Sequence, residues 1–122
     1  GNSNTTSNVN AFVGGGGSNS ASGIGAAIIG GQNNFINTNG IQSAIIGGRD
    51  NVINSGVTRS VILGGFGITG TTSDTTYVDN LNANGSVVIL SNLPTFDSDA
   101  LAGSLTTNQL YKTSTGELRI KL

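Results

Sequence analysis

The chain has 122 residues with five basic and six acidic side chains, so its net charge is close to zero. The balance argues against nucleic acid as a partner, and no apolar run approaches the roughly 18 residues that a membrane-spanning helix needs. Histidine and cysteine are both missing, which removes the commonest general base, the thiol nucleophile and the usual zinc ligands. We therefore expect no catalytic residue, no metal, no cofactor, no nucleic-acid partner and no membrane insertion.

A short phrase recurs along residues 10–70. Two of its copies read AAIIGGQNNFIN, from residue 26, and SAIIGGRDNVIN, from residue 43. Each copy joins an apolar triplet to a glycine pair, and the pairs stand at Gly14-Gly15, Gly30-Gly31, Gly47-Gly48 and Gly64-Gly65. This period of 16 to 17 residues is too short for a helix pair or a propeller blade. It suits one coil of a β-solenoid, with two short strands and two turns made by glycines.

The apolar triplets are hydrophobic on both faces of the predicted strands. Because side chains alternate along a strand, Ile45 and Ile46 point to opposite sides. Aligning the glycine pairs predicts two columns, which are Phe12, Ile28, Ile45 and Ile62 on one side and Val13, Ile29, Ile46 and Leu63 on the other. A thin coil has one interior, so the second column needs a cover. We expect an identical coil from another subunit as the cover, and the C-terminal segment of the same chain is the alternative.

The second half of each copy carries asparagines in register. Asn34 precedes one apolar pair and Asn51 precedes the next. Stacked coils place like residues on like residues, so we expect Asn34 to lie near Asn51 in a short amide ladder.

Three further segments flank the repeat. Residues 1–9 are expected to be an N-terminal tail or tag remnant. Residues 71–91 contain a polar linker and then TYVDNLNANGSVVIL, which predicts a hairpin turning at Asn84-Gly85. Its second strand would place Val87 and Ile89 in the core or at a subunit interface.

Residues 92–122 form the last predicted part, a C-terminal hairpin module. QLYKTSTGELRIKL predicts two strands with a turn near Thr115-Gly116. The final strand alternates, so Leu118, Ile120 and Leu122 are expected to face inward, and Glu117, Arg119 and Lys121 outward. Possible surface contacts in this module are Tyr111, Lys112 and Arg119.

Two acidic patterns bear on metal binding and catalysis. GGRDN resembles the repeat of calcium-binding β-rolls, but Asn33 stands where the preceding copy would need a carboxylate equivalent to Asp50. Calcium takes about six to eight oxygen ligands, several of them charged. Asp97 and Asp99 lie two apart in a short predicted turn, where helix capping is expected rather than glycoside hydrolysis. Neither pattern predicts a site.

Two stretches carry a resemblance to known families. SAIIGGRDNVINSG and AFVGGGGSNSASG resemble the left-handed β-roll repeats in the heads of trimeric autotransporter adhesins, and the related repeats in bacteriophage tail fibres. NLPTFDSDALAGSLTTNQLYKTSTGELRIKL is similar to a C-terminal module of phage and prophage structural proteins. The first resemblance covers about residues 10–70. Together they imply an intertwined homotrimeric β-solenoid or β-roll, followed by a small hairpin-rich module.

The resemblance also implies a function. We expect a viral structural protein of the virion tail, namely a segment of a trimeric phage tail fibre near the receptor-binding end. It would give rigidity and attach the particle to a glycan or protein receptor on the bacterial surface. The alternative is a head or stalk fragment of a bacterial trimeric adhesin, located on the bacterial cell surface. A polysaccharide-degrading tailspike is the third hypothesis, and six acidic residues supply little material for its active site.

Overall fold

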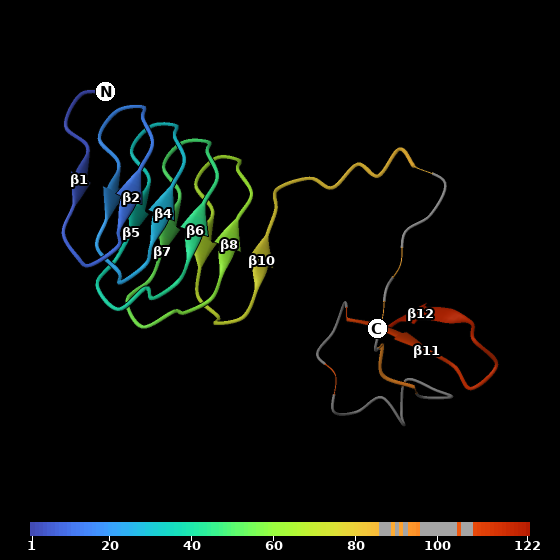
Figure 1. Cartoon of the computed structure of the whole chain (residues 1–122). Helices are drawn as coiled ribbons and strands as arrows, with labels where there is room; N and C mark the ends of the chain where they lie inside the picture. The colour runs from blue at the N-terminus through green and yellow to red at the C-terminus, as the bar shows by residue number, and fades with distance from the viewer. Residues whose placement is uncertain (86–88, 90, 92, 96–104, 106–108) are drawn as a thin grey trace. The chain divides into compact units, whose positions relative to one another are not determined.

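The computed structural model describes residues 1–85, 89, 91, 93–95, 105 and 109–122. The chain divides into two compact units, Gly1–Asn82 and Ala83–Leu122, and each unit is described by itself (Figure 1). The described residues include no helix that is long and apolar enough to cross a membrane.

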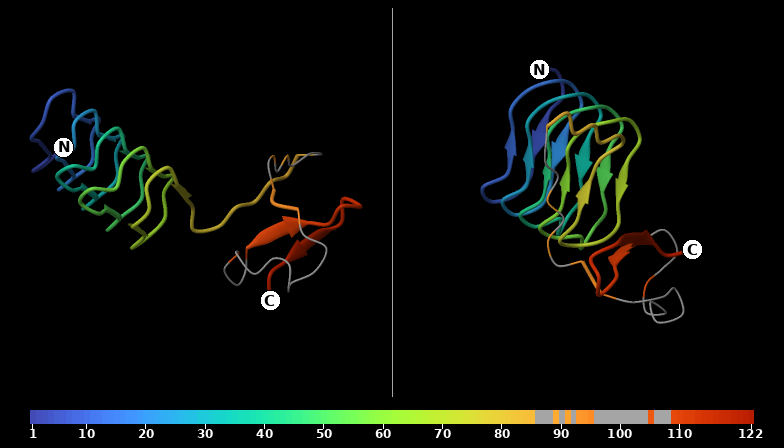
Figure 2. Two further views of the ribbon diagram at one scale, coloured as in Figure 1. Left: turned by 90° about the horizontal axis from the view of Figure 1, so that it is seen from below. Right: turned by 90° about the vertical axis from the view of Figure 1, so that its right-hand side faces the viewer.

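The first unit is a β-solenoid of five coils, each with two very short strands. The odd sheet contains β1 (Thr5–Thr6), β3 (Ser20–Ala21), β5 (Phe35–Ile36), β7 (Val52–Ile53) and β9 (Thr69–Gly70). The even sheet contains β2 (Phe12–Val13), β4 (Ala27–Ile28), β6 (Ala44–Ile45), β8 (Val61–Ile62) and β10 (Thr76–Tyr77). Neighbouring strands in both sheets pair in parallel, and Figure 2 shows the coils stacked along one axis. The predicted all-β solenoid is confirmed.

The coils have two lengths. Phe12 pairs with Ala27, 15 positions later, whereas Ala27 pairs with Ala44, 17 positions later. The longer coils carry two additional residues at one corner, Thr38-Asn39 in one coil and Ser55-Gly56 in the next. These corner insertions leave the strands in register, because they bulge outward from a turn. The Ser55 hydroxyl donates a hydrogen bond to the Thr38 carbonyl oxygen at 2.6 Å, which links the two insertions.

The register of the first coil corrects the predicted columns. Phe12 lies beside Ala27 and Val13 lies beside Ile28. Val13 therefore belongs to the column that was assigned to Phe12. The sequence permits both alignments because residues 14–17 are all glycine, so the glycine pair can be placed at more than one position.

The stacking of the turns decides between these alignments. A Cβ atom at Gly16 would overlap the carbonyl oxygen of Gly31, and a Cβ at Gly31 would overlap that of Gly48. Gly15-Gly16, rather than Gly14-Gly15, is thus the first glycine pair of the stack. Gly16 and Gly31 also have positive φ angles of 80° and 91°, which glycine adopts without steric cost.

The solenoid extends beyond residues 10–70 at both ends. Residues 1–9 are not a tail, because β1 pairs with β3 as the outer strand of the odd sheet. At the other end β10 pairs in parallel with β8, so Thr76–Tyr77 is not the first strand of the hairpin predicted at Asn84-Gly85. Threonine and tyrosine have high strand propensity, and here they pair with the preceding coil instead of forming a hairpin. Of the predicted second strand, Ile89 is 79% exposed and lies in no strand, and Val87 lies outside the described residues.

The interior is a ladder of like side chains. Ile28, Ile45 and Ile62 point inward from the even sheet, and Ile36 and Ile53 point inward from the odd sheet. All five are at most 1% exposed. Burying one isoleucine contributes about 2 kcal/mol, and successive coils repeat that gain. The Ile45 column is therefore the inner one, and the Ile46 column faces out.

A column of buried asparagines, Asn19, Asn34 and Asn51, stabilises the corner after the first three glycine pairs. The Asn34 side-chain amide donates to the carbonyl oxygens of Gly30 at 3.2 Å and Gly48 at 3.0 Å. Its Oδ1 accepts the backbone N–H of Asn51 at 3.1 Å. This confirms that Asn34 lies beside Asn51, although each amide bonds to backbone groups rather than to the next amide. The side chain thereby supplies partners that the backbone loses at a sharp corner.

Serine hydroxyl groups supply backbone hydrogen-bond partners at the corner before the later even strands, β6, β8 and β10. The backbone N–H of Ser60 donates to the Ser43 oxygen at 3.1 Å, and the N–H of Thr75 donates to the Ser60 oxygen at 3.3 Å. The Ser60 hydroxyl in turn donates to the Thr72 carbonyl oxygen at 2.9 Å. In the described part of the chain, no buried side-chain nitrogen or oxygen lacks a partner. The polar side chains buried at both corners are thus hydrogen-bonded.

Tyr77 closes the last coil. Gly70 occupies the column of Ile53, and the Tyr77 ring lies where a longer side chain would otherwise stand. The Tyr77 hydroxyl accepts the backbone N–H groups of Thr71 at 2.9 Å and Thr72 at 2.7 Å. Burial raises the pKa of Tyr77, but the hydrogen bonds from Thr72 and Thr71 outweigh it and hold the pKa below its ordinary value of 10. The phenol thus accepts the Thr71 N–H, whose equivalent Asn54 N–H donates to the next coil.

The second unit contains one antiparallel pair, β11 (Leu110–Lys112) with β12 (Leu118–Ile120). Its turn is closed by the Gly116 N–H, which donates to the Thr113 carbonyl oxygen at 2.9 Å. The predicted turn near Thr115-Gly116 is confirmed. The short turn predicted at residues 96–103, with Asp97 and Asp99, lies outside the described residues.

The final strand is exposed on both faces. Leu118, Ile120 and Leu122 are 54%, 51% and 86% exposed, so they do not face inward as predicted, whereas Glu117 and Arg119 are exposed as predicted. Tyr111 of β11 is fully buried, so its prediction as a surface contact is wrong. Tyr111 is directly opposite Arg119 in the register, and directly opposite residues share a face.

Candidate assembly interface

The outer face of the even sheet presents two columns of side chains along the stack. The ridge consists of Ile29, Ile46, Leu63 and Val78, which are 50%, 44%, 50% and 41% exposed. The trough beside it consists of Ala27, Ala44 and Val61, which are half-buried. Ridge and trough residues lie two apart in the chain, so they point to the same side of the sheet. Together they form a continuous apolar face over coils two to four, and Val78 extends the ridge into coil five, where Thr76 holds the trough position.

Phe12 continues this face into the first coil. The ridge position there is Gly14, which has no side chain. A Cβ atom at Gly14 would lie 3.1 Å from Cε1 and 3.3 Å from Cζ of Phe12, so the phenyl ring lies over the glycine. The ring is attached at the trough column but fills the ridge position, and Phe12 is 52% exposed. The apolar face therefore spans all five coils.

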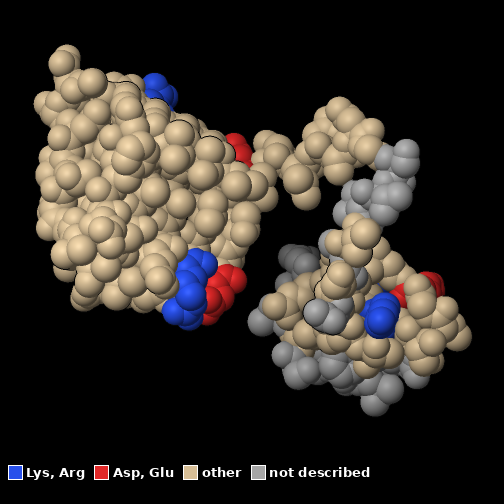
Figure 3. Space-filling view, viewed as in Figure 1, with Lys and Arg blue, Asp and Glu red and all other residues tan. Residues whose placement is uncertain are grey.

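Charged side chains of the solenoid lie outside both columns. Arg59 binds Asp74 through two hydrogen bonds of 2.6 and 2.9 Å, and the hydrogen bond from Arg59 lowers the pKa of the Asp74 carboxyl below its ordinary value of 3.8. At another corner the Arg49 guanidinium lies 4.8 Å from the centre of the Phe66 ring. Figure 3 shows charged atoms at the edges of the solenoid, with uncharged surface between them.

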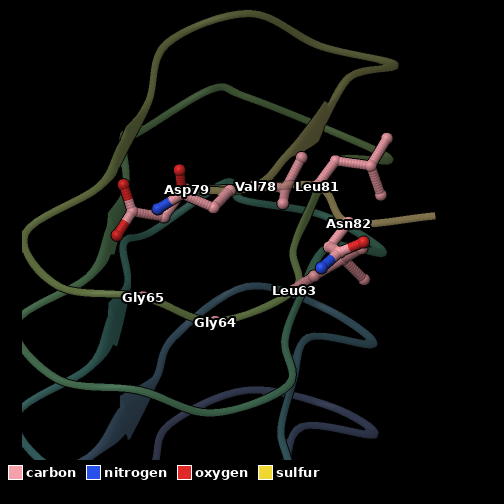
Figure 4. A pocket seen from close by; sticks show the side chains of 8 residues that line it. Leu63, Gly64, Gly65, Val78, Asp79, Leu81 and Asn82 are labelled. Atoms are coloured by element: carbon pink, nitrogen blue, oxygen red, sulfur yellow. The ribbon is translucent and has the colours of Figure 1, made fainter. Parts of the chain in front are cut away.

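A shallow pocket of about 510 Å³ lies where the ridge ends. Leu63 and Val78 of the ridge line it together with Leu81, which is 77% exposed. Figure 4 shows the Asp79 carboxylate directed away from Leu63 and Leu81, so the apolar wall of the pocket is continuous with the ridge. The described residues bring no three His, Cys, Asp or Glu side chains together as metal ligands. We therefore treat the pocket as the end of the apolar face.

Exposed apolar area of this kind has a cost in water. Burying each half-exposed ridge residue would contribute about 1 kcal/mol, and five such side chains, Phe12 included, about 5 kcal/mol. The inner columns are already packed, so the ridge is not an unfinished core. Contiguous exposed apolar surface on a folded unit is typical of an interaction site.

The predicted interface residues thus separate into two groups. Ile28, Ile45 and Ile62 belong to the interior of a single chain, with Val13 packed against them. Phe12, Ile29, Ile46 and Leu63 lie on the outer face. Of the predicted surface contacts in the second unit, Lys112 is exposed, and Arg119 is exposed and paired with Glu117 at 2.8 Å.

Sequence reasoning missed the hydroxyl column and the role of Tyr77. A signal for the column is present, since Ser43 and Ser60 each stand directly before an apolar triplet, 17 positions apart. The Tyr77 signal is weaker, because it depends on the small Gly70 beneath the ring in the odd sheet. The two-column split of the outer face was also missed, because only one outer column was considered.

Comparison of the chain with models of protein families, with curated proteins and with solved structures finds no match. The candidate interface is thus defined by the geometry and composition of the described residues.

Proposed function

We propose that this chain is a segment of a trimeric phage tail fibre near the receptor-binding end, acting as a stiff structural element in host attachment. Three copies associate through the outer face of the even sheet. The observation that carries the proposal is the exposed ridge on a coil whose own interior is complete. The resemblance of the repeats and of the C-terminal segment to fibre proteins supports the choice of protein class.

The solenoid architecture supports a mechanical role. Each coil is hydrogen-bonded to its neighbours through both sheets, and polar corner columns add bonds, with asparagines in the first four coils and hydroxyl groups in the last three. Stability in such stacks adds up between adjacent repeats, so rigidity increases with the number of coils. Association through the ridge removes the remaining apolar area from water and stiffens the stack further.

Attachment would use surfaces outside the apolar face. The corner insertions Thr38-Asn39 and Ser55-Gly56 are exposed, and so are Lys112 and Arg119 in the second unit. Threefold repetition presents each of these surfaces three times, and linked weak contacts gain avidity. The partner we propose is a glycan or protein receptor on the bacterial cell surface.

Light scattering on the purified chain tests the assembly. We expect the mass of a trimer for the wild type and a folded monomer for Ile46→Asp, because a carboxylate on the ridge cannot be buried without a partner. Asn54→Asp is the matched control, since Asn54 is exposed on the odd sheet. It should assemble like the wild type. A wild-type chain that remains monomeric over the accessible concentrations contradicts the proposal.

A binding assay tests the attachment. Fluorescently labelled wild-type protein should bind cells in a panel of bacterial strains, and the Ile46→Asp monomer should bind several-fold more weakly because it has lost avidity. Binding to extracellular-matrix proteins without binding to bacteria would favour the adhesin alternative instead.

A further inference from the structure

We propose that the copies associate heterologously, with the ridge of one chain packed into the trough of the next, and that Ala27 and Ala44 determine this contact. The inference rests on the self-association proposed above and adds its geometry. It assigns a role to two alanines that the inner core does not require.

The shape of the outer face is the first argument. Ile46 is 44% exposed, and Ala44, two residues earlier on the same side, ends at its Cβ atom. The same step occurs one coil earlier between Ile29 and Ala27. In these two coils a large side chain therefore stands beside a small one, whereas the trough position holds Val61 in the fourth coil and Thr76 in the fifth. A ridge-on-ridge contact would leave both troughs empty and forfeit their dispersion contacts, whereas a ridge laid in a trough fills it.

The regular spacing of the ridge residues indicates which partner binds this face. Ridge residues recur once per coil, and neighbouring parallel strands lie about 4.8 Å apart. A partner with a different spacing would match the face at one step and miss it at the next. A second copy of this chain has the same spacing over its whole length, so it is the partner that fits.

The threefold assembly proposed above requires parallel packing, because copies related by a single rotation axis all run in the same direction. With the coils in register, Ile29 and Ile46 lie level with the small Ala27 and Ala44 of the neighbour. The second unit exposes Leu110, Leu118 and Ile120 on β11 and β12.

Ridge and trough are different surfaces, so each chain offers one to each neighbour. A contact of this kind is heterologous, and it ends in a closed ring when the rotation between neighbours closes. A two-fold dimer could also pair each ridge with the trough of its partner, so the mass of the assembly distinguishes the dimer from the ring. The geometry thus agrees with a ring in which every ridge is covered.

Disulfide trapping can test the contact directly, because the chain has no cysteine of its own. One chain carries Ala44→Cys and a second, distinguishable by a tag, carries Ile46→Cys. The two are refolded together and oxidised, and the cross-linked fraction is measured on a non-reducing gel. Asn54→Cys, on the exposed odd sheet, replaces either partner in the control mixtures.

The expected result is a mixed dimer that joins the Ala44→Cys chain to the Ile46→Cys chain, several-fold more abundant than the cross-linked dimer in either single population. Efficient cross-linking by Ile46→Cys alone would show a ridge-on-ridge contact and overturn the inference. A trimeric mass without mixed cross-links would overturn this contact but leave the proposed assembly standing, whereas a monomeric mass would remove both. As a second measurement, Ala44→Phe should lower the assembled fraction and Ala44→Ser should not.

Discussion

At the scale of the residue, the fold depends on buried side chains that hydrogen-bond to backbone groups at the corners. Asn34 is fully buried and engages three groups, the carbonyl oxygens of Gly30 and Gly48 and the N–H of Asn51. Aspartate cannot donate to the two carbonyls, and serine is too short to reach three partners. Asparagine therefore recurs at this corner because it offers donors and an acceptor together.

Replacing Asn34 with alanine should destabilise the solenoid by about 3–5 kcal/mol, because each buried group left without a partner costs about 1–3 kcal/mol. Denaturant unfolding, monitored by circular dichroism at fixed protein concentration, measures the change. Asn54→Ala removes an exposed amide and should cost at most about 0.5 kcal/mol. Equal effects of the two substitutions would show that the asparagine column does not stabilise the stack.

At the scale of the element, no strand here is stable by itself. Ten strands of two residues each form the solenoid, and an isolated pair of such strands cannot offset its loss of chain entropy. Their stability comes from stacking, so the constraint on sequence is the register between coils rather than strand propensity. The corner insertions in two coils meet this constraint, because they add residues only where the chain has already left the sheet.

Removing both insertions together, residues 38–39 and 55–56, should leave the fold intact. All coils would then have the 15-residue spacing that joins Phe12 to Ala27, and we expect the melting temperature to stay within about 5 °C of the wild type. Thermal unfolding by circular dichroism checks this.

Deletion of Asn39 alone is the contrasting variant. A shift of one residue turns a strand's side chains to the opposite face, which would expose inner isoleucines. A single deletion that melts like the wild type would mean that the corner, not the strand, absorbs changes in length.

At the scale of the whole molecule, the solenoid has a fully packed interior and an apolar outer face that is exposed to water. The Ile45 column is sealed within one chain, whereas the Ile46 column, of similar composition, is left in water. The ridge and trough face is therefore where we place the copies of the proposed trimer. The exposed side of β11 and β12 is a second apolar surface that assembly can cover.

Assembly through this face should make thermal stability depend on protein concentration. Binding that favours the folded state raises the melting temperature by mass action, so we expect it to rise over about a hundredfold concentration range. Ile46→Asp should abolish the dependence while keeping a cooperative transition, and differential scanning calorimetry can measure both. A wild-type melting temperature that stays constant over the range would argue against assembly.

The amino-acid sequence alone determined the all-β class, the 17-residue period of the longer coils, the neighbouring positions of Asn34 and Asn51 and the C-terminal turn near Gly116. These features are local or repeat along the chain, so spacing reveals them. Only the tertiary structure decided that Ile45 lies inside and Ile46 outside, because strand alternation separates two faces without saying which one the coil encloses. It likewise decided the register of the first coil and the burial of Tyr111, since both depend on contacts between residues that are distant in the chain.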